Sequence, residues 1–182
     1  AREKLAAIAG RRSGRGGTRG VVLANLSGSA KPHWQVESGV ELPASLKPQK
    51  VGEGWVAASD RALAPLSVAF AAEAATGSVS ARPTGLENAL VKVTLDAHGR
   101  IAGLFDKRVG RELIEGAGNR LMVYRNDLPR TYDAWDIEPG FALGGEELTD
   151  FESLEVTAQG PHLGEITIVR KLGASTISQR LR

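Results

Sequence analysis

Short apolar runs recur along the chain from Val21 onward, and each is bounded by Gly, Pro, Asp or Asn. Residues 90–95 alternate apolar and polar side chains, which is typical of a half-buried β-strand. The turn at 96–99, in which Gly99 suits a positive φ, and the return over 100–105 complete a predicted hairpin. Further strands are predicted over residues 21–26, 35–37, 40–42, 54–58, 64–70, 111–114, 121–125, 151–157 and 165–170. No long helical period is visible, so the pattern predicts an all-β fold, an antiparallel β-sandwich.

The N-terminal residues differ from the rest of the chain in composition and in hydrophobic pattern. Residues 1–9 predict the end of a helix, which stops at Gly10. The Arg-, Gly- and Ser-rich stretch up to residue 20 has no apolar anchor and is typical of a flexible linker. Its arginines suit an acidic partner or RNA, but the low net charge of the chain favours a solvated connector. The predicted organisation is a helix end and linker over 1–20, a small β-sandwich over 21–83, and a larger β-sandwich domain over 84–182.

The ends of the chain indicate a fragment. The sequence begins with Ala1, and it ends at Arg182 in or just after a strand-like run. A strand that stops within its pairing segment leaves backbone groups unpaired. We therefore expect a piece of a longer polypeptide whose second β-domain is truncated at its C-terminus.

Charge and cysteine content narrow the class of protein. The 182 residues carry a formal net charge of +2 and no cysteine. A chain without cysteine has no disulfide and no thiolate metal site, and it suits a reducing compartment. The small charge does not indicate a nucleic-acid-binding face, and no apolar run approaches the roughly 20 residues of a membrane helix. We expect a cytoplasmic protein with no nucleic-acid or membrane partner.

Metal-binding and catalytic patterns are not visible. The three histidines, His33, His98 and His162, are far apart, and only Asp96 is near one of them. A hairpin turn accounts for that pair without a metal. No nucleophile elbow, phosphate loop or Ser/His/Asp arrangement is recognisable. We expect no catalytic residue, no metal site and no cofactor in this chain.

Aromatic residues offer the main binding candidates. Tyr132, Asp133, Trp135 and Asp136 lie in one Pro- and Gly-bounded loop between predicted strands. Aromatic faces stack on the apolar face of a pyranose, and carboxylates accept hydrogen bonds from its hydroxyls, so this group suits a sugar site. The alternative, left open here, is that Trp135 packs in the sandwich while the aspartates cap loop amides. Trp34 and Trp55 also suit a sugar platform, although core or sheet-edge packing is favoured.

Two segments carry a family resemblance. The stretch from Glu87 to Ile114 reads ENALVKVTLDAHGRIAGLFDKRVGRELI, and the stretch from Tyr132 to Pro139 reads YDAWDIEP. Together they resemble the C-terminal, all-β part of the glycoside hydrolase family 38 α-mannosidases, in which an EN…G.I.sl.Dk..gRE.l segment precedes a DAWDi segment. The opening VVLANLSGSAKPHWQVE is a looser match, since Leu26 stands where the family commonly has proline.

The resemblance implies a fold and a role. The expected architecture is a small sandwich followed by part of a galactose-mutarotase-like supersandwich. The chain would be the non-catalytic C-terminal β-domain of an α-mannosidase-like hydrolase and would support its own N-terminal catalytic domain. The parent would hydrolyse terminal α-mannosides or oligosaccharides with retention, and its catalytic domain would hold zinc. The resemblance is also compatible with a homo-oligomeric parent. Tyr132, Asp133, Trp135 and Asp136 would then lie at the sugar-pocket rim.

A second function class stays open at this point. A stand-alone carbohydrate-binding or mutarotase-like module would share the same sandwich fold, so the fold does not separate the two. A mutarotase needs a His and a Glu that face one pocket. The loop positions of His98 and His162 do not favour such a pair.

Overall fold

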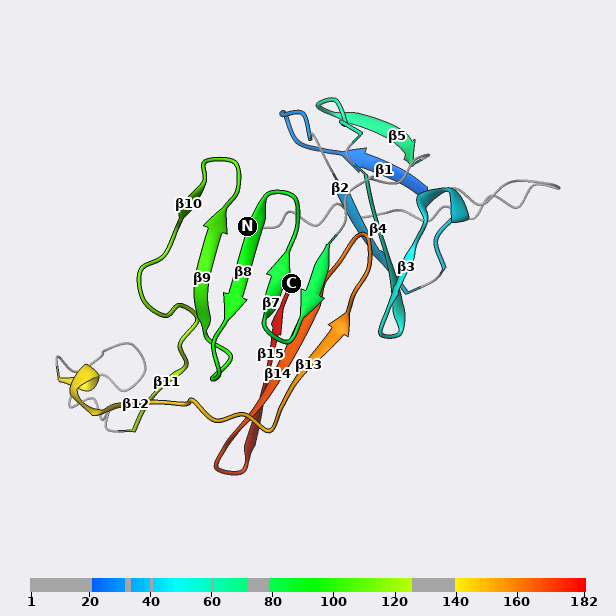
Figure 1. Ribbon diagram of the computed structural model, residues 1–182. Helices are drawn as coiled ribbons and strands as arrows, with labels where there is room; N and C mark the ends of the chain where they lie inside the picture. Colours follow the sequence, from blue (N-terminus) through cyan, green and yellow to red (C-terminus); the bar gives the residue numbers. More distant parts are fainter. Residues whose placement is uncertain (1–20, 32–33, 40, 60, 72–78, 126–139) are drawn as a thin grey trace, which may run out of the picture. The chain divides into compact units, whose positions relative to one another are not determined.

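The chain is all-β in the computed structural model, which describes residues 21–31, 34–39, 41–59, 61–71, 79–125 and 140–182 (Figure 1). These residues form antiparallel sheets and two short 3-10 helices. The all-β prediction is confirmed, and the antiparallel sheets are consistent with a β-sandwich. The predicted helix end and linker over 1–20 lie outside the described residues.

The chain divides into two compact units. One takes in the described residues up to Ala81, together with Val156–Glu165 and Arg182. The other takes in Arg82–Glu155 and Ile166–Leu181. The domain boundary drawn from the sequence, between residues 83 and 84, stays a prediction.

The first unit contains two small sheets. Strands β1 (Val21–Asn25) and β5 (Ser67–Ala71) form an antiparallel ribbon. The second sheet has the order β2-β4-β3, with β2 at Trp34–Ser38, β3 at Gln49–Val51 and β4 at Gly54–Ser59. A 3-10 helix, η1 (Ala44–Leu46), connects β2 to β3. The strand predicted over 40–42 is wrong, because the described residues of that range, Glu41 and Leu42, are not in a strand.

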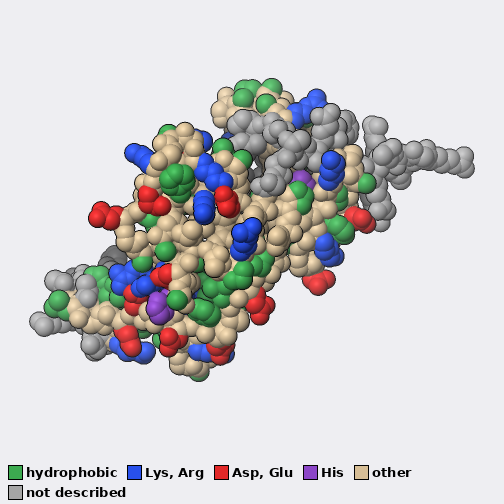
Figure 2. Space-filling model, viewed as in Figure 1, with side chains coloured by type: hydrophobic (Ala, Val, Ile, Leu, Met, Phe, Trp, Pro, Cys, Tyr) green, Lys and Arg blue, Asp and Glu red, His purple; other side chains and the backbone are tan. Residues whose placement is uncertain are grey.

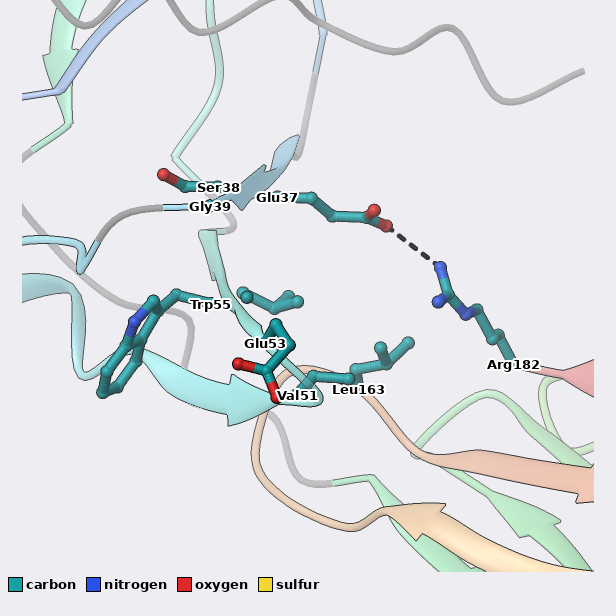
Figure 3. Close-up of a pocket in the computed structure, with 10 residues that line it drawn as sticks. Glu37, Ser38, Gly39, Val51, Glu53, Trp55, Leu163 and Arg182 are labelled. Carbon is teal, nitrogen blue, oxygen red and sulfur yellow. Dashed lines mark hydrogen bonds and ion pairs between the residues drawn. The ribbon is translucent and has the colours of Figure 1, made fainter.

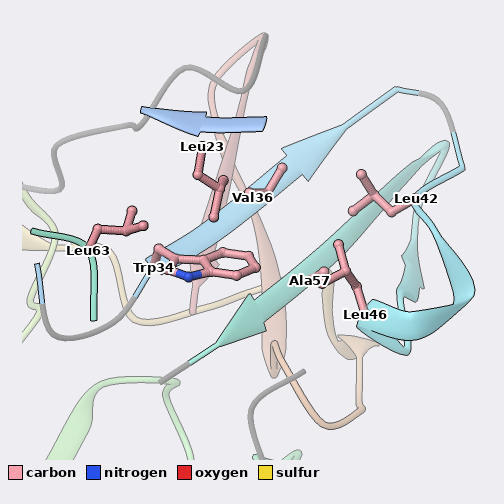
Figure 4. Close-up of a cluster of buried hydrophobic side chains, with 7 residues drawn as sticks. All are labelled: Leu23, Trp34, Val36, Leu42, Leu46, Ala57 and Leu63. Atoms are coloured by element: carbon pink, nitrogen blue, oxygen red, sulfur yellow. The ribbon is translucent and has the colours of Figure 1, made fainter. Parts of the chain in front are cut away.

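One face of the β2-β4-β3 sheet carries the core of the first unit. The alternation of a strand places Trp34 and Val36 on the same face of β2, where Ala57 of β4 joins them. Seven buried side chains pack together there, as Figure 4 shows: Leu23, Trp34, Val36, Leu42, Leu46, Ala57 and Leu63. Trp34 is 4% exposed, so it is a core residue and has no ring face free for a sugar.

The opposite face of the same sheet is covered by the turn at 160–163. The Gln49 side chain points to this face and binds the turn backbone through both of its polar atoms. Its Nε2 donates to the Leu163 carbonyl at 2.8 Å, and its Oε1 accepts the backbone N–H groups of His162 and Leu163 at 3.1 and 2.9 Å. A Cβ on Gly160 would lie 2.5 Å from Gln49 Cδ, so a larger residue there would displace the Gln49 amide from the turn.

The second unit contains β7, β8, β9, β10 and the last residue of β6, which form a five-stranded antiparallel sheet of order β10-β9-β8-β7-β6. Its strands are β6 (Ser80–Arg82), β7 (Gly85–Glu87), β8 (Val91–Leu95), β9 (Ile101–Asp106) and β10 (Arg111–Glu112). The predicted hairpin over 90–105 is confirmed as β8 and β9, which lie side by side in Figure 1 with a bulge at Thr94/Leu95. Gly99 has φ +71°, as its turn position requires.

The remaining strands form two smaller sheets. Strands β11 (Met122–Tyr124) and β12 (Gly145–Glu147) pair, with the 3-10 helix η2 (Phe141–Gly144) before β12. The last sheet has the order β13-β14-β15, with β13 at Ser153–Ala158, β14 at Glu165–Leu172 and β15 at Ser175–Leu181. Both units contribute residues to β13 and β14.

Candidate functional site

The predicted sugar-binding residues Tyr132, Asp133, Trp135 and Asp136 lie outside the described residues, in the segment 126–139. Their role stays a prediction. The elements on either side of this segment are described. Tyr124 of β11 pairs with Gly145 of β12, and the Tyr124 and Phe141 rings lie 5.0 Å apart between centroids. The described residues that border the segment therefore belong to one paired structure.

A network of charged side chains connects β12 to other residues of the second unit. Glu147, at the end of β12, accepts two hydrogen bonds from Arg120 at its Oε2, from Nε at 2.9 Å and from Nη2 at 2.7 Å. Its Oε1 lies 3.4 Å from Arg100 Nη1. The Glu147 side chain is 15% exposed, so these contacts are partly shielded from water. Paired charges with little water around them hold geometry better than exposed pairs do.

Arg100 extends the chain of charges to the β8–β9 turn. Its Nε donates to Asp96 Oδ2 at 2.7 Å. The other oxygen of Asp96 accepts the backbone N–H groups of His98 and Arg100 at 2.9 and 3.0 Å. Asp96 therefore closes the turn and positions Arg100 toward Glu147.

These contacts keep the carboxyl groups ionised. Partial burial works to raise the pKa of Asp96, but the hydrogen bonds from Arg100 and from the turn amides outweigh it and lower that pKa. The hydrogen bonds from Arg120 lower the pKa of Glu147 against a smaller desolvation effect. In the turn after β9, the Arg108 side chain and backbone N–H lower the pKa of Asp106 to about 2. A general acid at neutral pH needs a raised pKa, so these three groups suit counter-ions and turn closure.

Sequence reasoning did not find the Glu147 contacts. Arg120 and Glu147 are 27 positions apart, and Arg100 and Glu147 are 47 apart. No local spacing marks such a pair. The Asp96-to-Gly99 turn, in contrast, was visible, because the spacing of an Asx turn is local.

The described histidines occupy different settings. His98 is exposed in the β8–β9 turn. His162 is 8% exposed, and its Nε2 lies 2.8 Å from the Lys47 carbonyl, which accepts the ring hydrogen. Among the described parts of the chain, no three His, Asp or Glu side chains are grouped to hold a metal ion, so no residue here is assigned to zinc. His33 lies outside the described residues.

Asn25 begins the sequon Asn25-Leu26-Ser27, but its side chain is 1% exposed. Its Nδ2 donates to the carbonyls of Ser29, Leu63 and Ala64 at 2.8, 3.3 and 2.9 Å. An amide that is buried and bonded in this way serves the fold, and a glycan does not fit on it.

The surface of the described residues carries mixed charge. On the face that Figure 2 presents, Lys and Arg side chains lie among Asp and Glu side chains. No helix in the described ranges is long and apolar enough to cross a membrane.

Comparisons with known proteins find a family model and a human relative that match parts of this chain. The sequence model of the Glycosyl hydrolases family 38 C-terminal domain matches residues 86–182. The chain is also similar to human Alpha-mannosidase 2C1, with 37% identity over 76 residues. That alignment covers 41% of this chain and 7% of the human protein.

Proposed function

Because this chain belongs to glycosyl hydrolase family 38, we propose that it is a non-catalytic β-domain of an α-mannosidase-like hydrolase. The model of that family's C-terminal domain matches residues 86–182. The family match over more than half of the chain is the observation that carries this proposal. The similarity to human Alpha-mannosidase 2C1 supports the same substrate class. The role proposed for the chain is to support the catalytic domain of its own polypeptide, in a cytoplasmic and homo-oligomeric parent.

The proposed parent reaction is hydrolysis of terminal α-mannosides with retention. Retention needs a nucleophilic carboxylate and an acid/base carboxyl roughly 5 Å apart. We assign both to the catalytic domain, together with zinc, whose chemistry there would be to bind and polarise the substrate. The lowered pKa values of Asp96, Asp106 and Glu147 support a structural use of the carboxylates in this chain.

The contribution proposed for this chain is part of the sugar-pocket rim. Tyr132, Asp133, Trp135 and Asp136 combine an aromatic face with carboxylate acceptors, which suits a pyranose. The pairing of β11 with β12 and the contacts of Glu147 with Arg100 and Arg120 support this assignment, because they fix the residues that border the segment. A binding segment attached to a rigid base loses less entropy when the sugar binds.

Substitution of the rim residues tests this contribution. In the full-length protein, Asp133→Asn and Asp136→Asn are expected to lower kcat/KM for an aryl α-mannoside at least about tenfold, with an unchanged melting temperature. Asp150→Asn is the matched control, since Asp150 is an exposed aspartate between β12 and β13. A lower melting temperature with unchanged kcat/KM would assign the two aspartates to loop capping instead.

The stereochemistry of the product tests the proposed reaction. Proton NMR of fresh hydrolysate is expected to show α-mannose first, with β-mannose appearing only by mutarotation. Initial release of the β-anomer would contradict a retaining mechanism.

A further inference from the structure

Three large apolar side chains are exposed on the β1–β5 ribbon of the first unit and in the loops at its end: Leu26 at 82%, Leu66 at 76% and Val68 at 67%. Figure 1 shows the two strands side by side. Leu23 of β1 belongs to the core, so the next pair along the ribbon, Ala24 and Val68, faces away from it. The ribbon therefore has a second apolar face, and we call Leu26, Leu66 and Val68 the ribbon patch.

The segments that carry the ribbon patch have no charged residue. Residues 22–30 and 62–69 contain no Asp, Glu, Lys or Arg, although 24% of the whole chain is charged. A charged partner such as a nucleic acid or an acidic peptide would find no counter-charge in these segments. Large exposed apolar side chains without charges among them indicate contact with another apolar surface.

The two loops that present the patch are bonded to each other. Ser27 Oγ donates to Asn25 Oδ1 at 2.8 Å, and the backbone N–H of Leu66 donates to the Ser27 carbonyl at 3.1 Å. The Asn25 amide also donates to carbonyls in both loops, those of Ser29 and Ala64. The ribbon patch is therefore preformed, and a partner that binds it orders little new backbone.

Leu66 has a backbone conformation that is costly for a leucine. Its φ is +48°, in the left-handed region where glycine and asparagine are favoured. With 76% of the residue exposed, the side chain gains little packing from the described residues. Strained residues of this kind persist mainly where function uses the side chain. The observation points to a contact between Leu66 and a further surface.

The pocket on the β2-β4-β3 sheet, shown in Figure 3, differs from the ribbon patch in this respect. Its Glu37 and Arg182 side chains pair with each other at 3.4 Å, and Leu163 in its lining is only 5% exposed. Trp55 packs against the core, and the Lys50 ammonium lies 5.0 Å from its ring centroid. The pocket offers a partner little exposed apolar surface.

The size of the ribbon patch indicates what covers it. Three such side chains expose on the order of a few hundred Å², below the roughly 800 Å² that each partner contributes to a stable interface between separate proteins. A small patch suffices when both surfaces belong to one polypeptide, because the linkage raises their effective concentration. In the human relative, the aligned region is 7% of the protein, so most of that polypeptide lies outside it.

We propose that the ribbon patch docks an uncharged, apolar surface of the catalytic domain in the same polypeptide. Leu26 and Leu66 are the anchors of this contact, and Val68 extends it along β5. The inference rests on the proposed function, which supplies the catalytic domain, and it adds which surface of the chain makes the contact and with what chemistry.

Photo-cross-linking in the full-length protein tests the proposal. p-Benzoylphenylalanine replaces Leu26, and irradiation is expected to link position 26 to a peptide from outside residues 1–182, found by mass spectrometry in the monomer band. The same probe at Val109, which is 64% exposed in the turn after β9, is the matched control and should give no such link. A link between two copies, a link only within residues 1–182, or no link would overturn the proposal.

Leu66→Asn gives a second test, in which the two interpretations predict opposite signs. Asparagine tolerates the positive φ and removes an exposed apolar side chain, so an undocked Leu66 would give an equal or higher melting temperature. A docked Leu66 loses its apolar contact, and we expect the melting temperature of the full-length protein to fall by several degrees. Val109→Asn should leave it unchanged. An equal or higher value in Leu66→Asn would contradict the docking.

Hydrolysis of an aryl α-mannoside by the same preparations separates this inference from the proposed function. An active full-length protein without the cross-link would overturn the docking alone. An inactive protein that still forms the link would remove the proposed function and support the patch as a contact within one polypeptide.

Discussion

Asn25 is a buried side chain whose importance lies in its amide donor. Its Nδ2 meets three backbone carbonyls that link the end of β1 to the loop before β5. Asn25→Asp replaces this donor with an anionic acceptor, and we expect it to lower the free energy of unfolding by about 3 kcal/mol. Urea denaturation measures the change.

Asn88→Asp is the matched control for that substitution. Asn88 is exposed, and its Oδ1 accepts the backbone N–H groups of Leu90 and Val91 at 2.8 Å each. Aspartate keeps this acceptor, so we expect a change within about 0.5 kcal/mol. Equal losses in the two variants would show that the Asn25 amide donor has no special role.

Gln49 binds the turn at 160–163 through a complete set of hydrogen bonds. Gln49→Ala leaves two buried N–H groups and a carbonyl without partners, and we expect a loss of about 2 kcal/mol in the free energy of unfolding. Gly160→Ala should show a similar loss, because its Cβ displaces the Gln49 amide. Gln159→Ala, at the exposed neighbouring position, is expected to be neutral in the same denaturation assay.

At the scale of single elements, the turn after β9 makes stability depend on pH. The Arg108 contacts lower the pKa of Asp106 from 3.8 to about 2, so the folded state holds this proton less tightly than the unfolded state does. The stabilisation is therefore complete above pH 3.8 and is lost as the pH falls toward 2. We expect Asp106→Asn to flatten this dependence in denaturation curves between pH 5 and 2, about the range over which the proton binds.

Asp150→Asn serves as the control for this pH experiment. Asp150 is exposed in the loop between β12 and β13. Its substitution should leave the pH dependence of stability as it is in the wild type. A wild-type dependence in Asp106→Asn would mean that the Arg108 contacts do not stabilise the ionised form.

Elements with a strong local pattern were predictable from the sequence. The β8–β9 hairpin combines the strict alternation of β8 with an Asp- and Gly-containing turn, and both signals are local. Strands β3, β7 and β12 do not follow from the pattern, because each has three residues of which only one or none is a large apolar residue, whereas the equally short β11 is apolar throughout. Leu42 was placed in a strand, yet it is buried in the core from a non-strand segment. Apolar character reports burial more directly than it reports backbone conformation.

At the scale of the whole molecule, the family was predictable and the contact network was not. The motifs between Glu87 and Pro139 led to family 38, which the match over 86–182 confirms. The Gln49 contacts with the 160–163 turn join residues more than 110 positions apart, and no sequence period records them. The assignment of Tyr132, Asp133, Trp135 and Asp136 to a sugar site stays a prediction.

The central claim is that this chain is an accessory β-domain of a family 38 α-mannosidase. Its most direct test is hydrolysis of an aryl α-mannoside by the full-length protein, with and without a zinc chelator, and by residues 1–182 alone. We predict activity in the full-length protein that the chelator removes and zinc restores, and none in residues 1–182. Activity of residues 1–182 alone, or a full-length protein without activity on any α-mannoside, would contradict the claim.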